Sequence, residues 1–582
     1  NYTVESTGKG ILHFPDCDFT IKSDLSLQND AQLQLASSEG LYSPVQRTIF
    51  INGNLSVTHT ALLQVGCPNS GNIAKGTLGQ YRNYNLSLRK DFLYTSTTPL
   101  ISFHSKNFEN TINESYRLSL IFEGNKLQHM IMPPAANDLV QLNEMEYICN
   151  TTYALVVSGS GTHLIPQLYD LKAHSIRVDK SDTLTIAKED IHIIQFASFD
   201  TGGNKEAPSC NISGILDMGM NSVKESTIQE KGIFQLLPGS TLITAHPQGI
   251  DTIAAIGCIQ NSGTRLFDEG ANYIFNGYTT QKTGTGLPSR ILGSLTIDNS
   301  TMLLNGGVLL SKRTTIPGTL YLNRGKLLTT VQSPLVIPHT GLTLPEGGKP
   351  NSFVDGELVK TGLDNGKEFI FPLGNKDKWA RLGITYFNTT PTDTVKATYF
   401  KNDPGLSNST AHDTSLHHIS SKEYWMLKKT GTLQHARIKL YWESGNYSGI
   451  YTAKSQEVLL ARADTSGMLC RWQRESTDLI INGSALQGNV SAYTEIHSTN
   501  LFTFGSLYGI NPLPIELLSF SGTGSGKGNI LNWVTASEKN NRYFNIQRSV
   551  DGNQFTTLGQ VNGKGNSNTL THYTYFDSLL SN

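Results

Sequence analysis

The sequence predicts an all-β protein in which a solenoid is followed by antiparallel β-sandwich modules. Gly is abundant, with 54 of 582 residues, and Ser, Thr and Asn recur throughout, which favours strands and turns over helices. Short apolar triplets recur between turn residues in residues 1–340. All five Trp residues follow position 340, which marks a change of architecture. A chain of this length is expected to hold two to four domains.

Residues 1–340 are predicted to form a parallel β-helix. The phrase GSLTI at 293–297 is echoed by GTLYL at 318–322, and Leu295 and Leu320 are 25 residues apart (320 − 295). Short strands repeated at such a period are typical of stacked coils. A set of β-sandwiches is the alternative, and residues 86–205 fit as an irregular insertion or as irregular coils. At about 24 residues per coil, the rod would be about 65 Å long.

Residues 341–510 are predicted to form an antiparallel β-sandwich, because their strands are longer and rich in aromatic residues. Alternating apolar runs between turn residues are typical of half-buried antiparallel strands. The clearest are KEFIFPLG at 367–374, IKLYWE at 438–443 and FTFGS at 502–506.

Residues 511–582 open with NPLPIELLSFSG and continue with ILNWVTASEKNNRYFNIQRSVDGNQFTTLGQV, which predicts strand, loop, strand, turn, strand. This segment resembles the fibronectin-III-like (Ig-like) module that precedes the type IX secretion sorting domain in many secreted and surface proteins of Bacteroidota. The 341–510 phrases resemble the sandwich that often precedes it. The module is expected to be C-terminally incomplete at Asn582.

The resemblance implies export by the type IX secretion machinery to the outer cell surface or the medium. It also implies a glycoprotein, with O-glycans on Ser or Thr that lie between Asp and a small apolar residue. The matching acceptors are Thr183, Thr252, Thr394 and Ser578. N-glycosylation sequons such as Asn54, Asn150, Asn388 and Asn489 would stay unused in a bacterium.

Composition argues against two classes of partner. The net charge is −1 and only 16% of residues are charged, which gives no basic surface for nucleic acid. The sequence has no apolar run of the roughly 18 residues that span a bilayer, so a membrane-spanning helix is not expected. Any signal peptide is expected to have been removed.

The six cysteines do not form a C-x-x-C pair, which argues against a zinc site or a thioredoxin-type site. Spacing permits disulfides between Cys17 and Cys67 and between Cys210 and Cys258, while isolated buried thiols are the alternative. Cys149 and Cys470 have no evident partner.

Chemistry-bearing residues are few. Asp268, Glu269 and Arg265 near Lys282 are the best catalytic candidates, although acids beside Gly and Asn are usually turn residues. His417 and His418 are adjacent and are expected to point to opposite faces of a strand. The glycine-rich run at 522–528 lacks the Ser or Thr of a phosphate loop and is expected to be a hairpin.

We therefore expect a secreted or cell-surface structural or adhesive protein without catalytic activity, cofactor or metal. Its expected partners are the secretion machinery and, beyond it, surface glycans, other cells or copies of itself. One alternative is an extracellular β-helix protein that binds or degrades polysaccharide. The other is a subunit of an extracellular filament, because open sheet edges invite pairing.

Overall fold

The computed structural model describes most of the chain. The described residues are 2–6, 11–14, 17–35, 46–65, 81–96, 101–102, 115–131, 139–143, 146–149, 152–167, 171–187, 190–193, 207–225, 231–253, 255–386, 393–404, 416–443, 445–450, 458–464, 471–507, 516–526, 528–550, 554–567 and 569–578. The chain divides into two compact units, Asn1–Pro345 and Glu346–Asn582. The predicted change of architecture at 340 lies five residues before this division (345 − 340).

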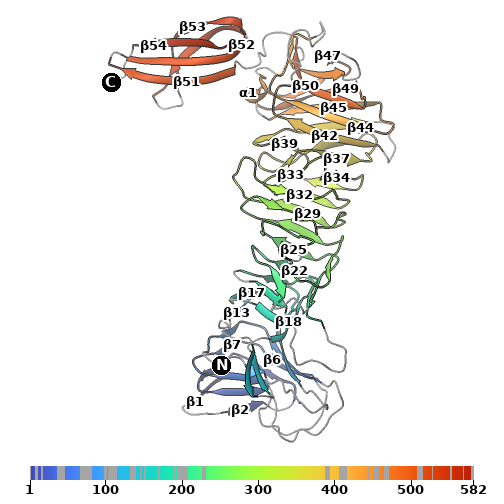
Figure 1. Ribbon diagram of the computed structural model, residues 1–582, viewed down its shortest axis with the longest axis vertical. Coiled ribbons are helices and arrows are strands. Elements are labelled where there is room, and N and C mark those ends of the chain that lie inside the picture. Colours follow the sequence, from blue (N-terminus) through green and yellow to red (C-terminus); the bar gives the residue numbers. More distant parts are fainter. Residues whose placement is uncertain are drawn as a thin grey trace. The chain divides into compact units, whose positions relative to one another are not determined.

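Unit 1 is built around a long parallel sheet that runs through the whole unit (Figure 1). In order across the sheet, its described strands are β1 (Tyr2–Ser6), β4 (Leu25–Asn29), β7 (Leu55–Val57), β10 (Phe92–Tyr94), β13 (Leu127–Ile131), β17 (His163–Gln167), β19 (Thr183–Thr185), β22 (Ile215–Asp217), β25 (Thr241–Thr244), β27 (Asn272–Phe275), β29 (Ser294–Asp298), β32 (Thr319–Arg324) and β35 (Leu342–Leu344). The twelve spacings between these thirteen described strands give a length of about 58 Å.

A second long parallel sheet accompanies the first, and the chain passes repeatedly from one sheet to the other. Its described strands are β3 (Phe19–Ile21), β6 (Arg47–Ile51), β9 (Tyr81–Leu88), β12 (Ser115–Phe122), β16 (Thr152–Val157), β18 (Leu171–Val178), β21 (Ser209–Ile212), β24 (Ile233–Leu236) and β26 (Arg265–Phe267), with β20 (Ile191–Ile193) and β23 (Val223–Glu225) alongside. Shorter parallel groups are β2 (Ile11–Phe14), β5 (Gln32–Leu35), β8 (Leu62–Val65) and β11 (Ile101–Ser102); β28 (Gln281–Lys282), β30 (Val308–Leu309) and β33 (Leu327–Leu328); and β31 (Thr314–Thr315) with β34 (Leu335–Ile337).

The core of unit 1 is made of side chains stacked from strand to strand. Leu216, Leu242, Tyr273, Leu295 and Leu320 are paired in succession and are at most 1% exposed. Leu295 therefore pairs with Leu320, which confirms the predicted 25-residue step. Other steps differ: 31 residues from Leu242 to Tyr273 (273 − 242) and 22 from Tyr273 to Leu295 (295 − 273). The parallel sheets are compatible with the predicted solenoid, but its coils vary in length.

The stretch 86–205 continues the same two long sheets. Here β9, β10, β12, β13 and β16 to β20 pair in parallel within these sheets, while β11 pairs with β8 in a shorter parallel sheet. Two strands of this stretch, β14 (Leu139–Asn143) and β15 (Glu146–Cys149), instead pair with each other as an antiparallel hairpin. Apart from this hairpin, the described strands of 86–205 belong to parallel sheets.

Two buried glutamines join neighbouring coils through the same set of bonds. Gln128 accepts the amide of Gly124 at 2.9 Å and donates through Nε2 to the carbonyls of Leu88 and Lys90. Gln281 repeats the pattern: it accepts the amide of Gly277 at 3.1 Å and donates to the carbonyls of Thr244 and His246. We call these two arrangements the glutamine clamps. They satisfy backbone groups that turns would otherwise leave buried and unpaired.

Cys210 and Cys258 are buried free thiols, so the predicted disulfide between them is not formed. Cys210 stacks between Ile176 and Phe234, and Arg265 occupies the position two coils after Cys210. Cys258 lies elsewhere on its coil, where its carbonyl accepts the amide of Val223. The 48 residues between the two cysteines (258 − 210) equal two coils of the predicted length of about 24 residues, but the uneven coil lengths separate the thiols.

Cys17, the other described cysteine of the predicted pairs, is an exposed free thiol. Its predicted partner Cys67 lies outside the described residues, as does Cys470.

Unit 2 contains antiparallel sheets. One is formed by β37 (Leu358–Thr361), β42 (Thr394–Phe400), β44 (Tyr424–Thr430), β50 (Thr499–Ser506), β46 (Leu459–Asp464) and β47 (Arg471–Glu475), with β43 (His418–Ile419) paired to β50. The other is formed by β38 (Glu368–Phe371), β41 (Leu382–Tyr386), β45 (His435–Trp442), β49 (Gly488–Glu495) and β48 (Ile480–Gly483). Smaller elements are β36 (Val354–Asp355), β39 (Leu373–Asn375), β40 (Lys378–Trp379) and the helical turn α1 (Gly445–Ser448).

Aromatic side chains join the two sheets. Trp442 on β45 and Trp425 on β44 both meet Phe504 on β50 edge-to-face, with ring centroids 6.0 Å and 5.4 Å apart. All three side chains are at most 4% exposed. Offset or edge-to-face aromatic pairs add about 0.5–1.5 kcal/mol to their burial. Trp425 and Trp442 are therefore core residues of unit 2.

The C-terminal strands form their own sheet: β51 (Glu516–Ser525), β52 (Gly528–Arg548), β53 (Thr556–Ser567) and β54 (Thr571–Asp577). The sequence predicted a loop within 530–550, but β52 is continuous and bends instead, with register shifts near Glu538 and Asn541. Buried Glu538 accepts hydrogen bonds from Thr535, Asn541, the Lys564 amide and Tyr573 at this bend. The last predicted turn of this segment falls on Asp551-Gly552, a pair that favours tight hairpins. That pair lies outside the described residues, as do Pro512 and Pro514, which are expected to stiffen the linker before this segment.

The described chain is thus all-β, with parallel sheets of many strands in unit 1. Among the described residues, no helix has the length and apolar character required to cross a bilayer.

Candidate functional site

The catalytic candidates from the sequence each make structural contacts. Arg265 donates from Nη1 to the carbonyls of Asp251 and Ile259, at 2.8 Å and 3.2 Å. Asp268 accepts the amide of Gly270 at 2.7 Å within its own turn. Glu269 forms an ion pair of 3.2 Å with Arg290. These contacts are typical of turns and coil-to-coil bridges, and they do not join Asp268 and Glu269 to Lys282.

His417 and His418 contact each other, contrary to the expectation that they point to opposite faces. Their Nδ1 atoms are 3.0 Å apart, so one ring donates to the other. The strand β43 begins at His418, so His417 precedes it and the alternation of a strand does not apply. In the described ranges, no group of three or more His, Cys, Asp or Glu side chains is placed to hold a metal ion.

The run at 522–528 lies at the hairpin between β51 and β52, where Ser525 pairs with Gly528. Lys527 is outside the described residues. The antiparallel pairing agrees with the hairpin that the sequence predicted.

The predicted O-glycosylation acceptors differ in their surroundings. Thr252 is exposed, and its hydroxyl lies 2.7 Å from that of Thr285. Ser578 is also exposed, whereas Thr183 and Thr394 are half-buried in strands. The aspartates that precede Thr183, Thr394 and Ser578 are buried, at no more than 5% exposure. Among the four sites, only the Asp251-Thr252 pair has both residues clear of the core.

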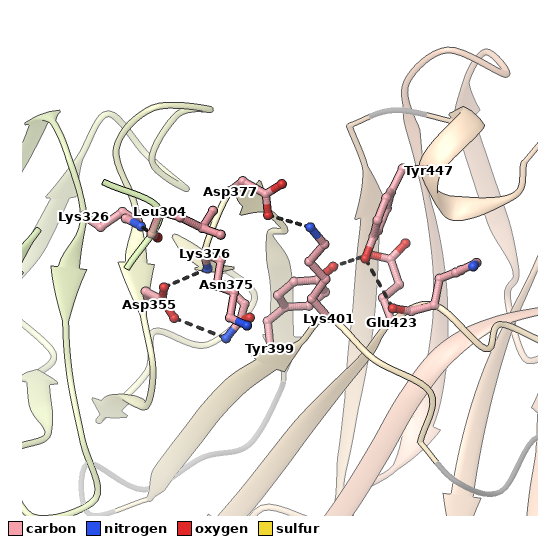
Figure 2. Close-up of polar contacts among 11 residues, drawn as sticks. Leu304, Lys326, Asp355, Asn375, Lys376, Asp377, Tyr399, Lys401, Glu423 and Tyr447 are labelled. Carbon is pink, nitrogen blue, oxygen red and sulfur yellow. Dashed lines mark hydrogen bonds and ion pairs between the residues drawn. The ribbon is translucent and has the colours of Figure 1, made fainter. Parts of the chain in front are cut away.

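Glu423 is a deeply buried carboxyl group, with 1% of its surface exposed. Figure 2 shows Tyr399 and Tyr447 turned toward it, and the Tyr399 hydroxyl donates to Oε2 at 2.7 Å. Burial raises the pKa of Glu423, while Ser448, Lys378 and Tyr399 lower it by a smaller amount. Its other oxygen, Oε1, is buried without a hydrogen-bond partner. A group this deeply enclosed is part of the core and cannot reach a substrate.

A pocket lies on the outward face of the β38–β41–β45–β49–β48 sheet. The pairing register creates it: Asn482 on β48 is opposite Asn489 on β49, which is opposite Tyr441 on β45. Leu382 is paired with Leu440, so Arg381 enters β41 beside Tyr441. Paired residues on neighbouring strands point to the same face. Four side chains from four strands or strand ends therefore form one row.

The turn that closes the pocket depends on two glycines. Gly483 has φ = +105°, and Gly488 approaches Trp442 so closely that a Cβ atom would lie 2.3 Å from its ring. The Trp442 indole N–H donates to the Ser484 carbonyl at 2.9 Å, which holds the turn over the sheet. Larger residues at either glycine would displace the turn.

Arg381 is fixed in place by three contacts. Its Nε donates to Glu443 at 2.6 Å, and its guanidinium carbon lies 4.2 Å from the ring centre of Tyr441 and 4.5 Å from that of Trp379. A planar guanidinium stacked between rings loses little further entropy when it binds a ligand. The neighbouring Lys439 ammonium is likewise neutralised, by an ion pair of 2.7 Å with the Glu368 carboxylate.

The pocket has a volume of ≈ 550 Å³ and is lined by Arg381, Tyr441, Asn482, Gly483, Ser484, Gln487, Gly488 and Asn489. Asn489 Oδ1 is buried and has no hydrogen-bond partner. Burial raises the pKa of Tyr441, and the Glu368 carboxylate raises it further, so the phenol stays protonated at neutral pH. The lining side chains offer hydrogen-bond donors and acceptors to a ligand.

Sequence reasoning did not find these residues, apart from naming Asn489 as a sequon. The alternation of IKLYWE at 438–443 does place Tyr441 on the same face as Lys439. The other lining residues lie on hairpins that are distant along the sequence, and only the pairing register of the strands brings them together.

Neither family models nor curated proteins nor solved structures gave a match to this chain.

Proposed function

We propose that this chain is a secreted or outer-surface adhesive protein, exported by the type IX machinery and without catalytic activity. Its parallel sheets would form a β-helix, unit 2 would begin with a β-sandwich, and the C-terminal strands would belong to a fibronectin-III-like module. The observation that carries the proposal is the continuous stack of buried side chains through unit 1, such as Leu216 to Leu320.

Such a stack supports a mechanical role. Ladder hydrogen bonds and buried apolar side chains, each worth about 1.5–3 kcal/mol, make a solenoid stiff along its length. A stiff element with long exposed faces suits a protein that displays a binding surface to its surroundings. The resemblance of residues 511–576 to a Bacteroidota module supports export to that location.

The structural contacts of Arg265, Asp268 and Glu269 favour adhesion over polysaccharide cleavage. Each already makes a turn or bridging contact, and a glycosidase needs two carboxyl groups facing one bond. Association into a filament is a variant of the same proposal. Light scattering and electron microscopy at high concentration test it, because monomers alone would exclude the filament.

Surface location is tested in the organism that produces the protein. Antibody labelling and protease treatment of intact cells should detect the chain at the surface. Disabling type IX secretion should move it into the periplasm. A cytoplasmic chain, or one unaffected by that disruption, would contradict the proposed route of export.

A further inference from the structure

We propose that the pocket lined by Arg381, Tyr441 and Asn489 binds an uncharged sugar residue of an extracellular polysaccharide. This inference rests on the proposed adhesive function and gives it a ligand class and a site. Three features carry it: unused hydrogen-bonding groups, charges that cancel within the protein, and a site that is already ordered.

The pocket contains hydrogen-bonding groups that the protein does not use internally. Asn489 Oδ1 is buried and unpartnered, which is unfavourable unless a ligand supplies a donor. The ion pair of Arg381 with Glu443 uses Nε, which leaves both Nη atoms as donors for a ligand. The side chains of Asn482 and Gln487 add amides at the exposed rim.

Charge selects against an anionic ligand. Glu443 lies 2.6 Å from Arg381, and Glu368 lies 2.7 Å from Lys439, so each cation is already paired. A carboxylate or phosphate has acceptors only, and it would leave Asn489 Oδ1 unsatisfied. A sugar hydroxyl both donates and accepts, so it can pair with Asn489 and with Arg381 together.

Shape and order also fit a sugar. A volume of ≈ 550 Å³ lies within the range of about 300–1,000 Å³ that is usual for small-molecule sites. The Trp442 bond to Ser484 and the stacked Arg381 fix the site beforehand, which reduces the entropy lost on binding.

The test uses the full chain and NMR titration with four sugars. The probes are glucose and galactose, each paired with its uronic acid, glucuronic or galacturonic acid. The proposal predicts binding of at least one neutral sugar, with the matched uronic acid at least tenfold weaker. Preference for either uronic acid, or no binding of both neutral sugars and of their oligomers, would overturn it.

Variants locate the binding. Asn489→Leu should weaken sugar binding at least tenfold, and Gln487→Ala, in the exposed turn, should weaken it severalfold without affecting the core. Thr398→Leu, on the outward face of the other sheet, is the matched control and should bind normally. Unchanged binding in both pocket variants would refute the site. If the chain still adheres to polysaccharide in that case, only this inference fails and the proposed function survives.

Discussion

Glu538→Gln provides a quantitative test of the bend in β52. The carboxylate accepts bonds from the Thr535 hydroxyl and the Asn541 amide, both at 2.8 Å, from the Lys564 backbone amide at 3.0 Å, and from the Tyr573 hydroxyl. Hydrogen bonds to a charged acceptor are worth about 1.5–3 kcal/mol, against about 1 for neutral pairs. The NH2 group of the glutamine would also lie opposite at least one of these donors, and neither of the two groups could then form that hydrogen bond. We expect a loss of about 3 kcal/mol.

Amide hydrogen exchange of the full chain measures this loss of stability strand by strand. A change of about 3 kcal/mol corresponds to exchange about 100-fold faster in β52 and β54 at pH 7. Tyr573→Phe removes a single donor and should accelerate exchange about tenfold. Tyr543→Phe is the control, because this side chain is 40% exposed. It should leave exchange unchanged.

The pH dependence gives a second check on the same residue. Burial raises the pKa of Glu538, but bonds from Tyr573, Asn541, Lys564 and Thr535 outweigh it and leave the pKa below the ordinary value. The stabilisation is therefore full above the unfolded pKa of about 4.3 and is lost as the pH falls through the folded pKa. The difference between wild type and Glu538→Gln should shrink on acidification. A variant that exchanges like wild type at pH 7, or a difference that grows in acid, would refute the reasoning.

Three further predictions concern other buried groups. Glu423→Gln should have the opposite pH dependence. Burial raises the pKa of Glu423, so the stability that this residue contributes is full below about pH 4.3 and is lost as the pH rises through the folded pKa. The thermal stability of the variant should therefore rise relative to that of wild type as the pH increases. Gln281→Leu breaks a glutamine clamp and should destabilise the adjoining coils by about 3 kcal/mol, with faster exchange at 272–283; normal protection would show that the clamp is dispensable. Burial raises the pKa values of Cys210 and Cys258 to about 12, so iodoacetamide should modify neither before unfolding, and mass spectrometry without reduction should find no peptide linking them.

The fold class could be predicted because its signals are local. The alternation of apolar and polar residues in GSLTI and its echo GTLYL indicated the pairing of Leu295 with Leu320. Turn lengths are not encoded in this way, since loops tolerate insertions at little cost. The step from Phe92 to Met130 is therefore 38 residues (130 − 92), and a uniform coil of about 24 residues did not hold.

Uneven coils also explain the error with the cysteines. A constant period would have placed Cys258 two coils after Cys210, but Arg265 occupies that position. The glutamine clamps, in contrast, could have been predicted from a repeated spacing in the sequence. Gly124 and Gln128 share the spacing of Gly277 and Gln281, and the glycine is needed because a Cβ atom at either position would lie 2.8 Å from the glutamine Oε1.

The pocket could not be read from the sequence, because its residues are distant along the chain. Arg381, Tyr441 and Asn489 meet only through the strand order β41–β45–β49, and a shift of one residue in either pairing would turn a member to the other face. Glycines at 483 and 488 were the available hint of a tight hairpin, but they do not identify the strand beside it.

The most direct test of the adhesive function is bead retention under flow, combined with measurement of polysaccharide length. Beads coated with the full chain are passed over surfaces that carry extracellular polysaccharide, with albumin-coated beads as the control. The account predicts that chain-coated beads are retained, that soluble polysaccharide competes for them, and that its chain length is unchanged after prolonged contact. Retention no better than that of albumin, or shortening of the polysaccharide, would contradict an adhesive protein without catalytic activity.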